Sequence, residues 1–153
     1  MQEWRVIEDG PKDGESNMAI DRAILASCAS GKTLPTLRLY SWERPTLTVG
    51  YAQDFAKEID VNRCRKLGIQ IVRRPTGGRA LLHNHEVTYS LTAPFLILSF
   101  HHHYSVLIKL LPEPCLRDLR KLVSAVRTWP WEESPIEAGI LFTLPHVYLV
   151  SII

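Results

Sequence analysis

The sequence predicts an α+β domain built on a mostly antiparallel sheet with flanking helices. In the first 94 residues, strand patterns outnumber helix patterns and the links between them are short. Short links favour antiparallel pairing over a doubly wound parallel sheet, which needs long crossovers. The chain has 153 residues, of which 46% are hydrophobic and 22% charged. These values indicate one globular domain and exclude disordered, collagen-like and coiled-coil chains.

The elements up to residue 51 follow from periodicity and from residues typical of caps and turns. Apolar residues near helical spacing predict a helix over Asn17–Ser30, with Ser16 as its N-cap and Gly31 after its end. Alternating side chains predict a strand over Leu37–Trp42, and Pro45 separates it from the next strand. The strands expected in this region are Trp4–Glu8, Leu37–Trp42 and Thr46–Tyr51.

The elements from residue 60 to residue 91 are shorter. A helix is expected over Asp60–Leu67, closed by Gly68. A β-branched run after it predicts a strand, and the Gly77-Gly78 pair predicts a turn. The strands expected here are Ile69–Arg73, Arg79–His83 and Val87–Leu91.

The character of the chain changes near residue 91, which suggests two parts, residues 1–94 and 95–153. Seven of the eight glycines precede this point, and the second part is aliphatic with proline interruptions. Helices are expected over 104–111 and 115–126, and no secure period follows residue 127.

Charge and cysteine usage narrow the class of protein. The net charge of +2 is too small to indicate nucleic-acid binding. Three scattered cysteines form no disulfide framework, which favours a reducing cytoplasm. The charged N-terminal segment does not resemble a signal peptide. The apolar stretch 136–153 contains Glu137, Pro145 and His146, so no membrane partner is expected.

The segment Ile71–His83 is the strongest candidate for a ligand-binding site. Two glycines after a basic strand let the backbone approach a ligand and expose its N–H groups to a phosphate, carboxylate or acyl carbonyl. Arginine adds charge-assisted hydrogen bonds. Arg73 and Arg74 are neighbours in a strand and face opposite sides, so at most one is expected to share a pocket with Arg79. The alternative is a hairpin turn with solvated arginines.

An ordered set of motifs over residues 4–94 resembles the biotin/lipoate protein ligase superfamily, in its lipoate branch. The run Arg73–His83 is similar to the signature loop of that superfamily. Gly77-Gly78-Arg79, where ligases usually carry a third glycine, is closer to cysteine-type octanoyltransferases, while Asn84 replaces the usual Asp. The other matching segments are Asn17–Asp21, Leu37–Trp42, Thr46–Tyr51 with Gln53, and His85–Ser90.

The resemblance implies a lipoate-pathway acyltransferase that moves an octanoyl or lipoyl group onto a lysine of a lipoyl-domain protein. It implies acyl carrier protein as donor, and 2-oxoacid dehydrogenase E2 components and the glycine cleavage H protein as acceptors. No permanently bound cofactor is implied, whereas a related ligase would use ATP. The implied substrate-binding residues are Trp42, Arg73, Arg74, Gly77, Gly78, Arg79, Ala80, Leu81, Leu82 and His83.

The catalytic residues of the superfamily are not recognisable after Pro94. Cys115 is the candidate nucleophile, because it opens an expected helix beside Arg117. Lys109 and Lys121 are the candidate lysines. Two alternatives stay open: an inactive family fragment, and an ATP-dependent ligase. We also expect residues 95–153 to be non-native sequence from a truncation or reading-frame change, which translation of the adjacent frames would test.

No metal site is predicted. His83 and His85 would share one face of a continuous strand, but spacing supplies no third ligand. The run His101–His103 points its rings in different directions and is expected to be a solvated turn.

Overall fold

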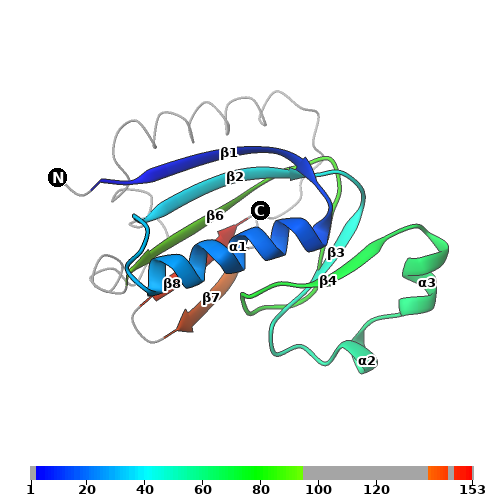
Figure 1. Ribbon diagram of the computed structural model, residues 1–153. Helices are drawn as coiled ribbons and strands as arrows, with labels where there is room; N and C mark the ends of the chain where they lie inside the picture. The colour runs from blue at the N-terminus through cyan, green and yellow to red at the C-terminus, as the bar shows by residue number, and fades with distance from the viewer. Residues whose placement is uncertain (1–2, 95–137, 145–146, 153) are drawn as a thin grey trace.

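The computed structural model describes residues 3–94, 138–144 and 147–152, which form two sheets and three helices (Figure 1). The helices are α1 (Gly14–Ala29), α2 (Phe55–Glu58) and α3 (Val61–Lys66). The strands are β1 (Arg5–Lys12), β2 (Thr36–Trp42), β3 (Thr46–Val49), β4 (Gln70–Arg73), β5 (Leu81–His83), β6 (Val87–Pro94), β7 (Ala138–Leu144) and β8 (Val147–Ile152).

The larger sheet has the strand order β1-β2-β6-β8-β7, and α1 lies across one of its faces (Figure 1). β1 pairs with β2 in parallel, because α1 carries the chain back to the starting edge. The other three pairings, β2 with β6, β6 with β8 and β8 with β7, are antiparallel. This sheet therefore brings the end of β2 beside the start of β6.

The smaller sheet has the order β4-β3-β5, with β3 in the middle. β3 is parallel to β4 and antiparallel to β5. Among the described strands, four of six pairings are antiparallel, which confirms the predicted mixed α+β fold with a mostly antiparallel sheet. Because β4 and β5 flank β3, the segment between them must cross over the end of β3.

The first helix begins earlier than the sequence predicted. Asp13, and not Ser16, is the N-cap: its side chain accepts hydrogen bonds from the N–H groups of Glu15 and Ser16, both at 3.0 Å. The Ser16 hydroxyl donates to the same carboxylate at 2.6 Å, so Ser16 supports the cap from inside the helix. This hydroxyl, together with the two N–H groups, holds the pKa of Asp13 below its usual value. Gly31 follows the helix with a φ of +67°, as expected.

Several element bounds also differ from the prediction. β1 continues past Glu8 to Lys12 with a register shift, β6 runs to Pro94, and β5 begins at Leu81 instead of Arg79. The short helix α2, capped by Asp54, carried no recognisable period. β7 and β8 lie in the segment where the sequence offered no secure period, and β8 pairs with β6. The helices expected over 104–111 and 115–126 lie outside the described residues.

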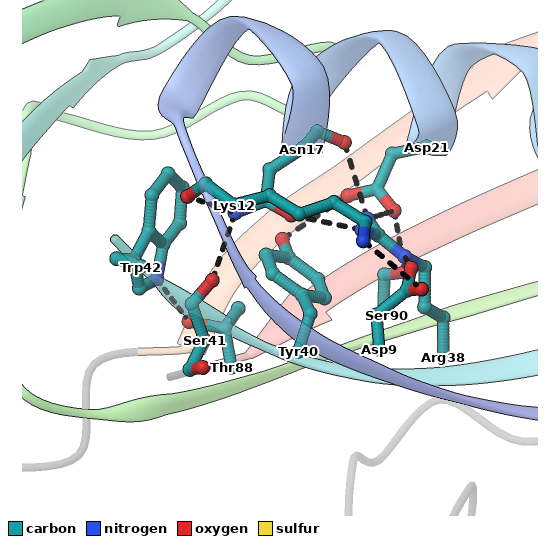
Figure 2. Close-up of polar contacts among 10 residues, drawn as sticks. All are labelled: Asp9, Lys12, Asn17, Asp21, Arg38, Tyr40, Ser41, Trp42, Thr88 and Ser90. Atoms are coloured by element: carbon teal, nitrogen blue, oxygen red, sulfur yellow. Dashed lines mark hydrogen bonds and ion pairs between the residues drawn. The ribbon is translucent and has the colours of Figure 1, made fainter. Parts of the chain in front are cut away.

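A buried polar network fastens α1 to the larger sheet (Figure 2). Arg38 of β2 is fully buried and donates to Asp21 of α1 at 2.9 Å and to Asp9 of β1 at 2.8 Å. Tyr40 and Ser90 donate to the same Asp21 carboxylate at 3.1 and 2.9 Å. Burial raises the pKa of Asp21, while Arg38 and the two hydroxyl donors oppose part of that rise. This clamp fixes β2, the strand that ends at Trp42.

The described residues contain no helix long and apolar enough to cross a membrane.

Candidate functional site

The segment 74–80, here called the glycine turn, crosses the end of β3. Register pairs Val49, the last residue of β3, with Arg73, and Thr48 with Leu81, so the turn must pass over the next residue, Gly50. The N–H of Arg74 donates to the Val49 carbonyl at 3.0 Å, and the N–H of Tyr51 donates to the Thr76 carbonyl at 2.9 Å. These bonds pack Arg74 and Thr76 of the turn against the end of β3, whereas Gly78 and Arg79 are exposed.

Gly50 allows this crossing because it has no side chain. A Cβ at position 50 would overlap the carbonyl oxygen of Gly78 and lie 2.9 Å from its carbonyl carbon. Gly78 itself has a φ of +88°, which is unfavourable for residues with a side chain. Two glycines thus meet backbone to backbone, and the resemblance had pointed to only one of them as a site residue.

Arg74 holds the glycine turn from inside. Arg74 is 4% exposed, and its guanidinium makes five hydrogen bonds, which equals the number of its N–H donors. The acceptors are Thr48, through its carbonyl and hydroxyl oxygens, and the carbonyls of Gly77 and Arg79, both at 2.7 Å from Nη2. Burial lowers the pKa of Arg74, but a guanidinium stays protonated at pH 7. A buried positive charge therefore lies directly beneath the turn.

Arg73 and Arg79 lie elsewhere. Arg73 Nη1 donates to the carbonyls of Gly50, Tyr51 and Gln53 at 2.7–3.0 Å, so it holds the segment that follows β3. Arg79 is exposed and pairs with Glu58 of α2 at 2.9 Å. As the strand alternation predicts, the guanidinium groups of Arg73 and Arg74 bind different carbonyls.

Trp42 and His83, here called the aromatic wall, lie where the two sheets meet. Their rings stack with centroids 4.1 Å apart and an interplanar angle of 18°. Both residues are buried, and Trp42 packs in an apolar cluster with Met18, Tyr40 and Val72. The Trp42 indole N–H donates to the Thr88 hydroxyl at 2.8 Å, a contact drawn in Figure 2. The sequence placed these two residues 41 positions apart, and the fold brings them together.

His83 is held at both ring nitrogens. Nε2 lies 2.8 Å from the Thr48 hydroxyl, and Nδ1 lies 2.5 Å from Glu86 Oε1. His85 adopts a φ of +51° and is exposed, so it does not share a strand face with His83 as expected from alternation. Among the described residues, no group of three His, Cys, Asp or Glu side chains is placed to hold a metal ion.

The remaining predicted site residues differ in their exposure to solvent. Gly77, Ala80 and Leu81 are half-buried, whereas Gly78 and Leu82 are exposed. Cys115, Lys109, Lys121 and the run His101–His103 lie outside the described residues.

Sequence reasoning missed residues that contribute to the site without belonging to the glycine-rich run: Thr48, Gly50 and Glu86. Thr48 and Glu86 lie within the family-like segments Thr46–Tyr51 and His85–Ser90, but no local signal assigns these two residues to the site. Gly50 directly follows a strand, and that position was the available clue. Each becomes visible only when the strand register is known.

The glycine turn offers donors to an anionic or carbonyl group. Within the described part of the chain, no hydrogen bond is made by the N–H of Gly77, Gly78 or Arg79. The Thr76 hydroxyl, in a residue 1% exposed, has no partner among these residues either. Unpaired donors above a buried guanidinium can stabilise negative charge on an oxygen.

Comparisons with known proteins cover the part of the chain that forms this site. A model of the lipoyl protein ligase A/B catalytic domain matches residues 13–122, which include both the aromatic wall and the glycine turn. Octanoyltransferase LipM of Carboxydothermus hydrogenoformans is 50% identical over 91 residues, covering 60% of this chain and 34% of that protein. LipM of Kyrpidia tusciae is 41% identical over 122 residues, covering 80% of this chain and 44% of that protein.

Solved structures share the fold. A lipoate-protein ligase A bound with ATP aligns with a TM-score of 0.69 at 22% identity, over 99% of this chain and 66% of that chain. This chain spans about a third to less than half of the length of the two curated relatives. The family match covers well over half of this chain, and the fold and motif order agree with it. The chain therefore belongs to the lipoyl protein ligase A/B catalytic domain family, within the biotin/lipoate ligase superfamily.

Proposed function

We propose that this chain carries the acyl-binding part of a lipoate-pathway octanoyltransferase. The observation that carries the proposal is the identity of 41–50% to proteins named octanoyltransferase LipM, within a family match that includes the whole glycine turn. The acyl group would be octanoyl or lipoyl, and its acceptor a lysine of a lipoyl-domain protein.

In the proposed site, the aromatic wall and the glycine turn bind different parts of the acyl group. The acyl chain would lie against the aromatic wall and its apolar neighbours, which are buried in this structure. The N–H groups of Gly77, Gly78 and Arg79, which make no hydrogen bond to another described residue, suit the acyl carbonyl oxygen, which becomes negative when a nucleophile attacks its carbon. The charge of Arg74 beneath the turn strengthens these dipoles. The thioester bond of the donor then breaks, and the donor thiol leaves.

The nucleophile and the partners belong to the same proposal. Cys115 is the candidate for the thioester-forming group. The proposed donor is acyl carrier protein, and the proposed acceptors are lipoyl domains of E2 components and the H protein. A structural neighbour bound with ATP keeps ligase chemistry as the second candidate. The cytoplasmic location also stays a prediction.

The experiment incubates the 153-residue chain with octanoyl-acyl carrier protein and an apo lipoyl domain, with and without ATP. A mass gain on the acceptor lysine without ATP is the expected result. A gain only with free octanoate and ATP would indicate a ligase. No gain under either condition would refute the transferase proposal and support an inactive chain.

A matched pair of variants tests the role of the turn. Gly78→Val should abolish transfer, because the position has a φ of +88° and its carbonyl lies against Gly50. Gly10→Val, at an exposed position of β1 where an added Cβ meets nothing within 4 Å, should leave transfer unchanged.

A further inference from the structure

We propose that Glu86 is a positioning residue that couples the aromatic wall to the glycine turn. The inference rests on the proposed acyl site, and its structural part can be tested separately. Glu86 lies in the link between β5 and β6, which belong to different sheets. Its side chain is 16% exposed, and one oxygen, Oε1, receives hydrogen bonds from two directions.

The first branch runs from Glu86 to the glycine turn. Oε1 lies 2.5 Å from His83 Nδ1, and His83 Nε2 lies 2.8 Å from the Thr48 hydroxyl. That hydroxyl accepts a hydrogen bond from Arg74 Nη1 at 3.0 Å. Arg74 Nη2 then donates to the carbonyls of the turn at Gly77 and Arg79. Three side chains thus connect the carboxylate to the turn backbone.

The second branch runs from the same oxygen to the aromatic wall. The Thr88 hydroxyl donates to Glu86 Oε1 at 3.2 Å, and the Trp42 indole N–H donates to Thr88 Oγ1 at 2.8 Å. Because Trp42 also stacks on His83, this branch closes a ring through both members of the wall. The Glu86 carboxylate therefore orients both rings of the aromatic wall: Trp42 through Thr88, and His83 directly.

The indole of Trp42 and the guanidinium of Arg74 only donate, while each threonine hydroxyl has one proton and two acceptor lone pairs. Thr88 gives its proton to Glu86. In the proposed coupling, Thr48 gives its proton to His83 Nε2, so His83 carries its proton on Nδ1 and donates to Glu86.

The arrangement connects the buried cation of Arg74 to the Glu86 carboxylate through two side chains, Thr48 and His83. Hydrogen bonds to a carboxylate are about twice as strong as neutral ones. A group at Glu86 that cannot accept would leave the Thr88 hydroxyl and His83 Nδ1–H without an acceptor. The hydrogen-bond paths from Glu86 to Trp42 and to Arg74 would then be broken. The aromatic wall would no longer be held in a fixed position relative to the glycine turn.

The test compares Glu86→Leu, Glu86→Gln and the control Glu8→Leu in the 153-residue chain. The ¹⁵N shifts of the histidines report the tautomer, with the His83 signals assigned from their absence in His83→Gln. We expect the Nδ1–H tautomer in the wild type, in Glu86→Gln and in the control, whose position is exposed on β1. Glu86→Leu should lose this tautomer preference.

Binding of octanoate, measured by calorimetry, gives the second readout. We expect Glu86→Leu to bind about tenfold more weakly and Glu86→Gln to recover most of the affinity, because its amide oxygen still accepts. If His83 of the wild type is the Nε2–H tautomer, the proposal is overturned, whether or not octanoate binds. This measurement on the wild type also tests the proposal if Glu86→Leu does not fold. Unchanged tautomer and affinity in Glu86→Leu would overturn it too. Failure of all variants to bind octanoate, with the expected tautomers, would refute the acyl site and retain the coupling.

Discussion

Replacing Gly50 with alanine should displace the glycine turn. The new Cβ would lie 2.9 Å from the carbonyl carbon of Gly78, and closer still to its oxygen. Ordinary contact between carbon atoms is about 3.5 Å, so the turn must retreat by about 0.6 Å or more. The obstacle is backbone on both sides, held by the hydrogen bonds of Arg74, and no side-chain rotation can relieve it.

The expected cost is about 1–3 kcal/mol of unfolding free energy, the range for overpacking a well-packed site. With an m-value of about 2 kcal/mol per molar urea, a loss of 2 kcal/mol lowers the unfolding midpoint by about 1 M. Octanoyl transfer should fall by about a hundredfold, since displacements approaching 1 Å have effects of that size.

Gly10→Ala is the matched control, because a Cβ at Gly10 meets nothing within 4 Å. It should be neutral or stabilise the fold by up to about 1 kcal/mol, through a less flexible unfolded chain. If Gly50→Ala unfolds at the same urea concentration as Gly10→Ala, the close approach of the two glycines is wrong.

Three further changes test other parts of the fold. Arg74→Lys should cost about 2 kcal/mol or more in urea unfolding, because a buried guanidinium with five hydrogen bonds is replaced by an ammonium that cannot reach all of its acceptors, at about 1 kcal/mol for each bond lost; an unchanged midpoint would contradict its structural role. Asp21→Asn should cost about 3 kcal/mol, since it leaves Arg38 without one buried partner, whereas the exposed Asp54→Asn should change stability by less than about 0.5 kcal/mol. Burial raises the pKa of Tyr89 to about 12 from 10.0, so the folded state keeps a proton that the unfolded chain loses. Stability should therefore fall between pH 10 and 12 in the wild type, and Tyr89→Phe should remove that part of the decline.

The candidate site was predictable only in part. The glycine-rich run and Trp42 were predicted because family motifs are local in sequence. The structure stacks Trp42 on His83 where the two sheets meet and places the glycine turn across the end of β3. Thr48 and Glu86 lie within family-like segments, but their roles could not be predicted, since each acts through a contact with His83 that depends on register. Whether these residues bind an acyl group stays a proposal.

Sequence alone determined the features that depend on neighbours along the chain. Alternating side chains marked most strands, Gly31 and Gly68 marked helix ends, and the motif order indicated the family. Even local features failed where two candidates competed, as when Asp13 took the cap expected for Ser16. Tertiary structure alone decided that β1 and β2 run parallel, that β4 and β5 flank β3, and that Gly50 lies under Gly78. Such contacts join residues far apart in the chain, so their energies depend on the whole packing arrangement and leave no periodic pattern in the sequence.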